Sequence, residues 1–396
     1  MKIAYREIDG TSPGYWMLLA ALGVLTAAGL AGAWYMEHHG HVVTGMTNQI
    51  VWGMPHVFAV FLIVAASGAL NVASIASVFG KTPYKPLAPL SGLVAIALLA
   101  GGLMVLVLDL GRADRLVVAM THFNFKSIFA WNIFLYTGFF AIVAVYLWAM
   151  MERRMNRYSA GVGFAAFVWR LVLTTGTGSI FGFLVARQAY DSAVLAPMFI
   201  AMSFSYGLAA FLLVLVAAYA WSGRPLGAAV LARLKNLLIV FIAAALYFVA
   251  VFHVTNLYFA KQAGFLRFIL LDGGIYPALF WGVQVLAGSL VPMALLAHPR
   301  VGATRCGITA AAGLVVLGGI AQMYVTIIGG QAYPLELFPG MAETSSFFDG
   351  RVHPYAPSLP EVALGLGGVA VAGIIVVLAV KLLQFLPERL DFAQSP

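Results

Sequence analysis

Ten long apolar segments constrain the fold of this chain more than any other feature. Each is about 20 residues or longer, enough for a helix to cross the ~30 Å hydrocarbon core of a bilayer. The segments are continuously apolar, whereas strands of a membrane barrel alternate between apolar and polar positions. With 62% hydrophobic residues, the chain has too few polar residues to cover a soluble domain. We predict an all-α integral membrane protein with ten transmembrane helices, near 15–35, 50–78, 87–108, 126–151, 161–188, 194–221, 232–259, 275–297, 308–330 and 361–386.

A weak internal repeat indicates how these segments are grouped. The stretch MPHVFAVFL (Met54–Leu62) resembles APMFIAMSF (Ala196–Phe204), and each lies at the start of an apolar segment. Membrane proteins built from repeats often place a site where the repeats meet. We therefore expect two four-helix bundles plus two extra helices. The predicted organisation is a single membrane domain, 1–396, with a first bundle at 50–188, a second at 194–330 and a last helix at 361–386.

The basic residues are distributed unevenly over the loops. Most of the 22 Lys and Arg residues lie at the two termini and in the loops after the second, fourth, sixth and eighth segments. Cytoplasmic loops carry an excess of Lys and Arg, so this pattern predicts a bacterial inner-membrane protein with both termini in the cytoplasm. The net charge of +8 is spread over short loops, which argues against a nucleic-acid partner. The long loops at 36–49 and 331–360 then lie outside, where such loops usually serve a partner or a site.

The cysteine count limits the redox chemistry of the protein. Cys306 is the only cysteine, which excludes an internal disulfide, an iron–sulfur cluster held by the protein's own thiolates and covalent haem attachment. His56 and His253 could together ligate one b-type haem, but six of the eight His residues lie in loops. We therefore expect no covalently bound cofactor, and a b-type cytochrome stays as an alternative.

One polar stretch is unusual in a protein with only 9% charged residues. It runs from Asp109 to Asn132, on the predicted outer side. Polar groups at a membrane boundary are costly unless they pair with each other or carry out a function. Asp109 and Arg112 are three residues apart, so on a helix they share a face, either as a structural ion pair or as a gated pair lining a cavity. The stretch supplies six candidate residues of a binding site: Asp109, Arg112, His122, Asn124, Trp131 and Asn132.

Several of these residues, and His56, have two interpretations at this stage. His122 and Asn124 precede the fourth segment and either cap its helix or face the site. Trp131, beside Asn132, is either an interfacial anchor or a surface for a flat aromatic head group. His56, near the outer start of the second segment, either bonds to a neighbouring carbonyl or exchanges a proton with a bound quinone.

A second set of polar residues lies deeper in the predicted helices. Arg170 is near mid-membrane, where a charge costs at least ~2.5–3.5 kcal/mol on insertion scales. It either takes part in a hydrated proton path or bonds to helix carbonyls. Asn71 is surrounded by small residues that allow close helix packing, or it belongs to the same path. The candidate residues of a proton path are Asn71, Arg170, Thr174 and Thr177.

Four motifs resemble those of the NrfD/PsrC family, the quinone-interacting membrane subunits of bacterial respiratory complexes. They are DLGR (Asp109–Arg112), HFNFKS (His122–Ser127), QAYP (Gln331–Pro334) and YAPSLPE (Tyr355–Glu361). With ten segments, the resemblance extends over essentially the whole sequence and is closest to the ten-helix branch. Within that branch, the stretches 44–81 and 102–134 are most similar to the DsrP-type subunits of Dsr membrane complexes, which are linked to dissimilatory sulfur metabolism.

The resemblance implies a subunit with no cofactor of its own that binds quinone or menaquinone as an exchangeable substrate near the periplasmic face. It implies docking to a periplasmic ferredoxin-like iron–sulfur subunit. For Dsr complexes it also implies cytochrome b-like, cytochrome c-like and cytoplasmic iron–sulfur subunits, and it suggests proton translocation. His56 corresponds to a family histidine on the first core helix. Trp131 stands where relatives carry an acidic residue, a departure that argues against a proton route at that position.

A secondary transporter is the alternative from a different class, because internal repeats and buried polar groups also occur there. Broken helices at corresponding midplane positions of the two halves would favour a transporter. The sequence has no paired Gly or Pro interruptions at such positions.

Overall fold

The fold was obtained as a computed structural model that describes residues 4–335, 338 and 350–390. Within these residues, ten helical spans are long and apolar enough to cross a membrane, which confirms the predicted all-α integral membrane protein. Of the loop predicted at 331–360, residues 336–337 and 339–349 lie outside the described part.

The first span and the third to seventh spans are single helices or a helix with a short 3-10 turn before it, and these belong to the regular part of the bundle. They are α1 (Pro13–His39), η2 (Thr82–Leu87) with α4 (Ala88–Leu108), α6 (Ile128–Met151), η4 (Asn156–Tyr158) with α7 (Ser159–Gly182), α8 (Leu195–Trp221) and α9 (Ala228–Tyr258). The tenth span is also one helix, α15 (Leu359–Leu382).

The remaining three spans are interrupted or contain wide π-helical turns. They are α2 (Met54–Ala69) with α3 (Asn71–Ser77), α11 (Ile275–Pro277) with η7 (Ala278–Leu290) and α12 (Val291–Ala297), and α13 (Arg305–Tyr324) with η8 (Val325–Gly329) and α14 (Gly330–Ala332). Short helical turns in the loops are η1 (His41–Val43), η3 (Ala113–Arg115), α5 (Leu116–Thr121), η5 (Ala260–Gln262), α10 (Ala263–Arg267) and η6 (Phe268–Asp272).

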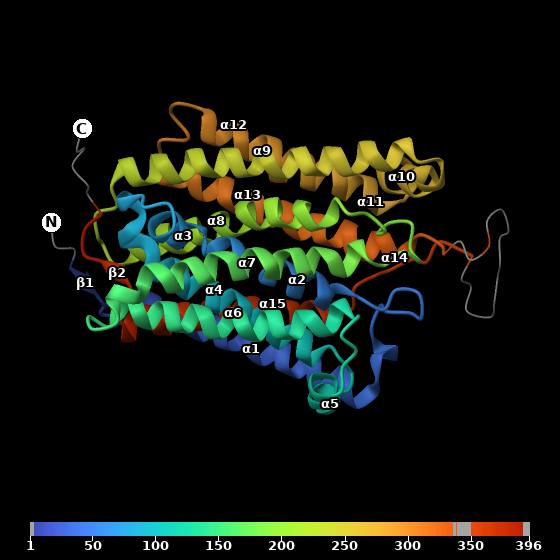
Figure 1. Cartoon of the computed structure of the whole chain (residues 1–396), viewed down its shortest axis with the longest axis horizontal. Coiled ribbons are helices and arrows are strands. Elements are labelled where there is room, and N and C mark those ends of the chain that lie inside the picture. Colours follow the sequence, from blue (N-terminus) through green and yellow to red (C-terminus); the bar gives the residue numbers. More distant parts are fainter. Residues whose placement is uncertain (1–3, 336–337, 339–349, 391–396) are drawn as a thin grey trace.

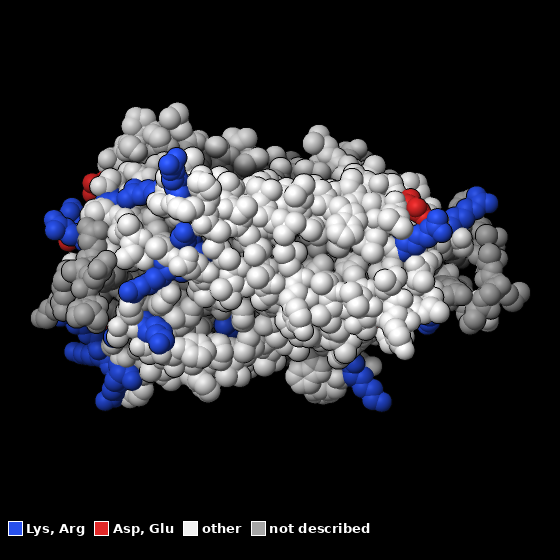
Figure 2. Space-filling view, turned by 90° about the horizontal axis from the view of Figure 1, so that it is seen from above, with Lys and Arg blue, Asp and Glu red and all other residues white. Residues whose placement is uncertain are grey.

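The helices run roughly parallel along the long axis, with both termini at one end (Figure 1). We call this end the termini face and the other end the opposite face. At the termini face, β1 (Tyr5–Arg6) pairs antiparallel with β2 (Leu386–Pro387), which ties the two ends of the protein together. Most of the visible Lys and Arg side chains gather at the termini face (Figure 2). The ends of the bundle therefore differ in charge in the way that the loop pattern predicts.

α2 is the central helix, because it is buried on every side along most of its length. It packs against α4, α8 and α15, while α1 lies at the edge along α15. The crossing of α2 and α8 is close: a Cβ on Gly68 would lie 1.6 Å from the carbonyl oxygen of Ser203. Glycine at this position lets the two backbones touch. One continuous core thus joins both halves, and their division into two bundles remains a prediction.

The second span is interrupted at Leu70, and a neighbouring helix satisfies the freed backbone groups. The Ser91 hydroxyl on α4 donates to the carbonyl of Ala69 at 2.7 Å and accepts from the N–H of Ala73 at 3.1 Å. Inside a membrane such groups need protein partners. The repeat would place a matching break in α8, but α8 is continuous from Leu195 to Trp221. The paired breaks expected of a transporter are therefore absent at these positions.

Candidate functional site

His56 and Asp109 meet at the opposite face, where α2 begins and α4 ends. His56 lies in the first turn of α2, and Asp109 directly follows the last residue of α4. The imidazole Nδ1 is 2.7 Å from the carboxylate Oδ2. The Asp109 side chain is 1% exposed and the His56 side chain is 17% exposed, so the pair is open only on the histidine side. Packing of α2 on α4 thus joins two residues that the sequence singled out separately.

The Asp109 carboxylate has unused hydrogen-bonding capacity. Its short contact with His56 lacks the angles of a hydrogen bond, and neither carboxylate oxygen has a hydrogen-bond partner among the described residues. Buried carboxylate oxygens normally accept hydrogen bonds, and leaving one unpaired is costly. The pair can therefore accept an O–H donor from a ligand or water. It can also exchange a proton with a bound ligand, because an imidazole nitrogen can donate or accept one.

Aromatic rings lie beside this pair. The Trp52 ring is nearly parallel to the His56 ring, at 25° and with 6.0 Å between centroids. The rings of Phe129 and Phe181 lie 6.0 and 5.7 Å from Trp52. Flat aromatic groups pack well against such ring faces. The site thus combines a proton-exchanging pair with a surface suited to a planar head group.

Gln331, from the end of the ninth span, holds Trp52 in place. Its Oε1 accepts from the backbone N–H groups of Val51 and Trp52, each at 3.0 Å. Its Nε2 donates to the carbonyls of Trp52 and Ile327, each at 2.9 Å. Gln331 is 1% exposed, so its amide is buried with its hydrogen bonds made. The loop before α2 is therefore fixed by a residue of the second half of the protein.

Arg187 strengthens this junction between loops. Its guanidinium donates to the carbonyl of Gln331 at 3.0 Å and to the carbonyl of Gln49 at 2.7 Å. Burial lowers the pKa of Arg187. The two carbonyls offset part of the cost of removing its charge from water. Two loops of the opposite face and the end of the ninth span are joined in this way.

A buried carboxylate, Glu361, fixes the segment that precedes α2 through a second network of hydrogen bonds. Glu361, 0% exposed, lies in the first turn of α15 and accepts from the backbone N–H groups of Gly45 and Ser358, both at 2.8 Å. The Tyr355 hydroxyl donates to it at 2.6 Å and accepts from the N–H of Met54 at 2.6 Å. Burial, and then the hydrogen bond to Glu361 and the charge of Glu361, raise the pKa of Tyr355. This network anchors the segment before α15 on the start of α2.

The predicted pairing of Asp109 with Arg112 is wrong. Arg112 binds Asp114 instead, through contacts of 3.0 and 2.9 Å, and both side chains are more than half exposed. α4 ends at Leu108, and Gly111 has a φ of +69°. The helical spacing that would place the two residues on one face therefore stops before Arg112. The pairing raises the pKa of Arg112 and lowers that of Asp114.

The other residues of the polar stretch are spread over the surface and the helix interface. His122 is exposed beside the Thr121 hydroxyl, and Asn124 accepts from the N–H of Lys126 as a local turn. Trp131, 46% exposed, donates from Nε1 to the carbonyl of Phe125. Asn132 is buried and donates to the carbonyls of Ile128 and Gly176. These four side chains therefore bond to groups other than His56 and Asp109.

Three of the four proton-path candidates are connected into two short groups. The Thr174 hydroxyl donates to Ser67 Oγ at 2.6 Å, and Ser67 Oγ donates to the carbonyl of Arg170. The Arg170 guanidinium, fully buried, makes one long bond of 3.5 Å to the carbonyl of Ser67 and lies over the ring of Phe204. Thr177 donates to Asn132 at 3.5 Å. The fourth, Asn71, has a buried Nδ2 without a partner among the described residues.

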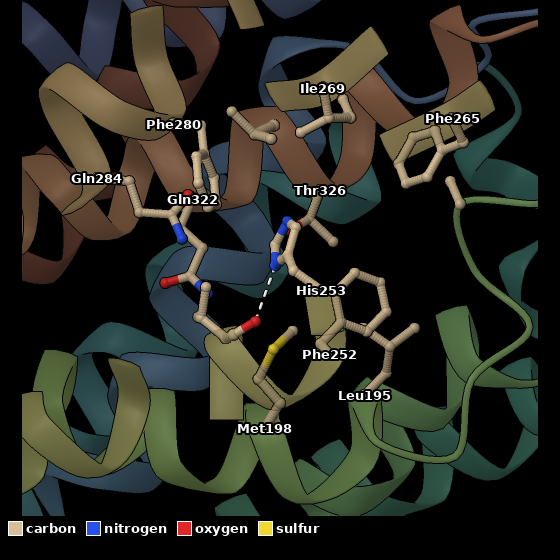
Figure 3. A pocket seen from close by; sticks show the side chains of 13 residues that line it. Leu195, Met198, Phe252, His253, Phe265, Ile269, Phe280, Gln284, Gln322 and Thr326 are labelled. Carbon is tan, nitrogen blue, oxygen red and sulfur yellow. Dashed lines mark hydrogen bonds between the residues drawn. The ribbon is translucent and has the colours of Figure 1, made fainter. Parts of the chain in front are cut away.

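A small cavity lies in the second half, between α8, α9, η7 and α13 (Figure 3). Its volume is about 30 Å³, and His253, Gln284 and Gln322 line it together with apolar side chains. A cavity of this size holds about one or two water molecules and is too small for a porphyrin. His253 Nδ1 is 2.8 Å from the carbonyl of Val249. The size of this cavity therefore argues against a b-type haem at His253.

Sequence reasoning missed the residues that hold the pair in place. Trp52, Gln331, Tyr355 and Glu361 all lie at the start of α2 or bond to it. The motifs QAYP and YAPSLPE contain three of them, so the signal was present in the sequence, but neither motif indicates which distant loop it binds. No group of three His, Cys, Asp or Glu side chains that could hold a metal ion comes together in residues 4–335, 338 or 350–390.

Comparison with known proteins places this architecture in a family. The family model described as polysulphide reductase, NrfD, matches residues 42–334, which include His56, Asp109 and Gln331. The "Hdr-like menaquinol oxidoreductase integral membrane subunit" of Archaeoglobus fulgidus is 29% identical over 394 residues, covering 98% of each protein.

Two further relatives are subunits of reductases. One, from the selenate reductase of Mesobacillus selenatarsenatis, is 20% identical, covering 96% of each protein. The other, from the polysulfide reductase of Wolinella succinogenes, is 24% identical, covering 72% of this protein and 96% of the relative. Since the family model matches well over half of the residues, the chain belongs to the NrfD, polysulphide reductase family of membrane subunits.

Proposed function

We propose that this protein is the quinone- or quinol-handling membrane subunit of a multi-subunit oxidoreductase. The main support is the His56–Asp109 pair beside the ring of Trp52. The Asp109 carboxylate of this pair is buried, and its oxygens have no hydrogen-bond partner among the described residues. The relatives include a subunit named for a menaquinol oxidoreductase and others named for selenate and polysulfide reductases, which supports a role in such a complex.

The chemistry assigned to the pair is proton exchange with a bound quinol or quinone. Oxidation of quinol releases two electrons and two protons, and reduction of quinone takes them up. His56 receives or supplies a proton at the quinol oxygen, and Asp109 orients the imidazole and stabilises its charged form. The electrons pass to or from a partner subunit, because Cys306 alone cannot hold an iron–sulfur cluster. Quinone or menaquinone is thus a substrate that enters and leaves.

The orientation and partners follow from charge and resemblance. The basic termini face would be cytoplasmic in a bacterial inner membrane, so the His56 site would open toward the periplasm. A ferredoxin-like iron–sulfur subunit would dock there. The resemblance to DsrP-type subunits extends this proposal to a complex linked to dissimilatory sulfur metabolism, with cytochrome b-like, cytochrome c-like and cytoplasmic iron–sulfur partners.

A proton path is the second part of the proposal. Arg170, Thr174 and Ser67 form a connected group at mid-membrane, and the buried Nδ2 of Asn71 lacks a partner among the described residues. Buried donors without partners are commonly met by water. The path would run from these groups toward Thr177 and Asn132.

The test is quinol-linked turnover of the assembled complex with His56→Ala. We expect turnover to fall by roughly 10²-fold or more, the usual contribution of a proton-transferring group, while the complex still assembles. His122→Ala is the matched control, because that histidine is exposed and lies in the polar stretch beside Thr121, away from the pair. Equal turnover of the His56 variant and the wild type would refute the assignment.

A further inference from the structure

A groove on the outside of the bundle lies between α6 and α7, near the termini face. It has a volume of about 330 Å³ and is lined by Ala141, Ile142, Val145, Gly161, Val162 and Ala165. Ala141, Val145, Gly161 and Ala165 are exposed, so the groove opens outward rather than into the core. In a protein that spans a membrane, this side faces the hydrocarbon region. The small side chains leave a channel between the two helices.

Three arginines lie at the end of this groove. Arg153, Arg154 and Arg157 belong to the loop that joins α6 to α7, and all three are exposed. No carboxylate lies within 4.0 Å of any of their guanidinium groups in the part of the sequence that the structure describes. Glu152, the only acid of the loop, accepts from the backbone N–H of Arg154. Arg157 also lies over the ring of Tyr158, at 4.6 Å from its centroid. The loop therefore offers three exposed cationic groups that an anion can approach.

The groove and the arginines lie at matching depths. Gly161 is four residues after Arg157, and Val145 is six residues before the end of α6. At 1.5 Å of rise per residue, these two positions lie within about 10 Å of the loop. An apolar groove that begins below a cationic cluster is complementary to a phospholipid, whose apolar acyl chain extends from an anionic phosphate.

We propose that the α6–α7 groove and the Arg153–Arg154–Arg157 cluster form a binding site for one anionic phospholipid. One acyl chain fills the groove and the phosphate contacts the guanidinium groups, which bind phosphate oxygens with paired N–H donors. Charge complementarity favours this occupant over a partner's apolar helix, which would leave the arginines without anions. The site is at the termini face, away from His56, so it does not depend on the proposed quinone chemistry.

The test measures which lipid the full-length protein retains. The protein is purified from detergent supplemented with equal phosphatidylglycerol and phosphatidylcholine, and bound lipid is counted by native mass spectrometry. The variants are the triple change Arg153→Gln, Arg154→Gln, Arg157→Gln and the groove-filling change Gly161→Leu. A Cβ on Gly161 meets no atom within 4 Å, so this change fits the fold. Arg300→Gln and Gly282→Leu are the controls, since both positions are exposed and lie outside the groove.

We expect the wild type and both controls to retain one phosphatidylglycerol in preference to phosphatidylcholine. The triple variant should lose that preference by roughly tenfold or more, since each basic residue near a surface adds to anionic lipid binding. Gly161→Leu should lose the retained lipid while keeping the melting temperature of the wild type. Retention of phosphatidylglycerol by Gly161→Leu, equal retention of both lipids by the wild type, or a partner helix cross-linked into the groove would each overturn the proposal.

Discussion

Each half of the protein has a histidine near the opposite face, His56 at the start of α2 and His253 near the end of α9. The side chains around the two histidines differ. His56 lies 2.7 Å from a buried carboxylate and is partly open to the outside. His253 is bonded to the carbonyl of Val249 in its own helix, and its ring lies 4.7 Å from that of Phe280. The first histidine has a partner that can share its proton. The second is held by its own helix and by aromatic packing.

The internal repeat sharpens this difference. In the alignment of Met54–Leu62 with Ala196–Phe204, His56 corresponds to Met198, which lines the small cavity beside His253 (Figure 3). In this alignment the two halves place polar groups at related positions, yet no carboxylate lines the cavity beside His253. A place in the repeat is therefore not enough to identify a site, and the charged partner and the access to it are what distinguish the first half.

The largest effect should come from removing the charge of Asp109. Asp109→Asn keeps the size of the side chain but cannot stabilise a protonated His56, so we expect quinol-linked turnover to fall by about 10²-fold. If the two residues act as a unit, the double variant with His56→Ala should be little worse than either single variant. Turnover assays on the assembled complex measure this. Additive losses would show that the two residues act separately.

Gln331→Ala should have the next largest effect. The change removes the acceptor of the Val51 and Trp52 N–H groups, which are only partly buried, so we expect a loss of about 0.5–1.5 kcal/mol for each hydrogen bond. The loop that carries Trp52 then loosens, so we expect roughly tenfold lower turnover with a clear fall in melting temperature. Gln284→Ala is the matched control in the second half, because the Oε1 of that buried amide has no partner among the described residues. Equal effects of the two variants would remove the distinction between the halves.

Tyr355 gives a smaller effect that depends on pH. Its pKa is raised above the ordinary value of 10.0, so the folded protein keeps the phenol proton that the unfolded protein releases. This stabilisation is fully present below about pH 10 and is lost as pH rises through the raised pKa of the folded state. At neutral pH, Tyr355→Phe should lose about 1–2 kcal/mol through its missing hydrogen bond to Glu361. Thermal melting of both proteins at several pH values measures this, and the deficit of the variant should narrow between about pH 9 and 11, because only the wild type loses stability there. A deficit that stays constant over that range would contradict the raised pKa.

The ten spans could be predicted from the sequence because lipid imposes a simple rule on length and polarity. Their observed bounds differ from the predicted ones mostly by a few residues; the first two spans begin at Pro13 and Met54 rather than near 15 and 50. His56 and Asp109 could be named as candidates for a related reason, since polar residues at an apolar boundary are conspicuous.

Their pairing could not be predicted, because it depends on how α2 and α4 pack. The expected partner of Asp109 was Arg112, its neighbour on an assumed helical turn, but the helix ends one residue before Asp109. Gln331 lies 279 residues from Trp52, and no local pattern connects them. Local sequence was thus enough to identify the polar residues at the membrane boundary. Which of them contact each other is determined by tertiary packing.

The smallest effect should come from His253→Leu. The change removes only the bond to Val249 within α9 and a ring contact with Phe280, and leucine fills most of the space. We expect turnover within about twofold of the wild type and a melting temperature within a few degrees of it. His253→Asn, which keeps a polar side chain, serves as the control for hydration of the cavity. A large loss of turnover in His253→Leu, restored in His253→Asn, would mean that the second half also exchanges protons, and the carboxylate would then not be what distinguishes the two histidines.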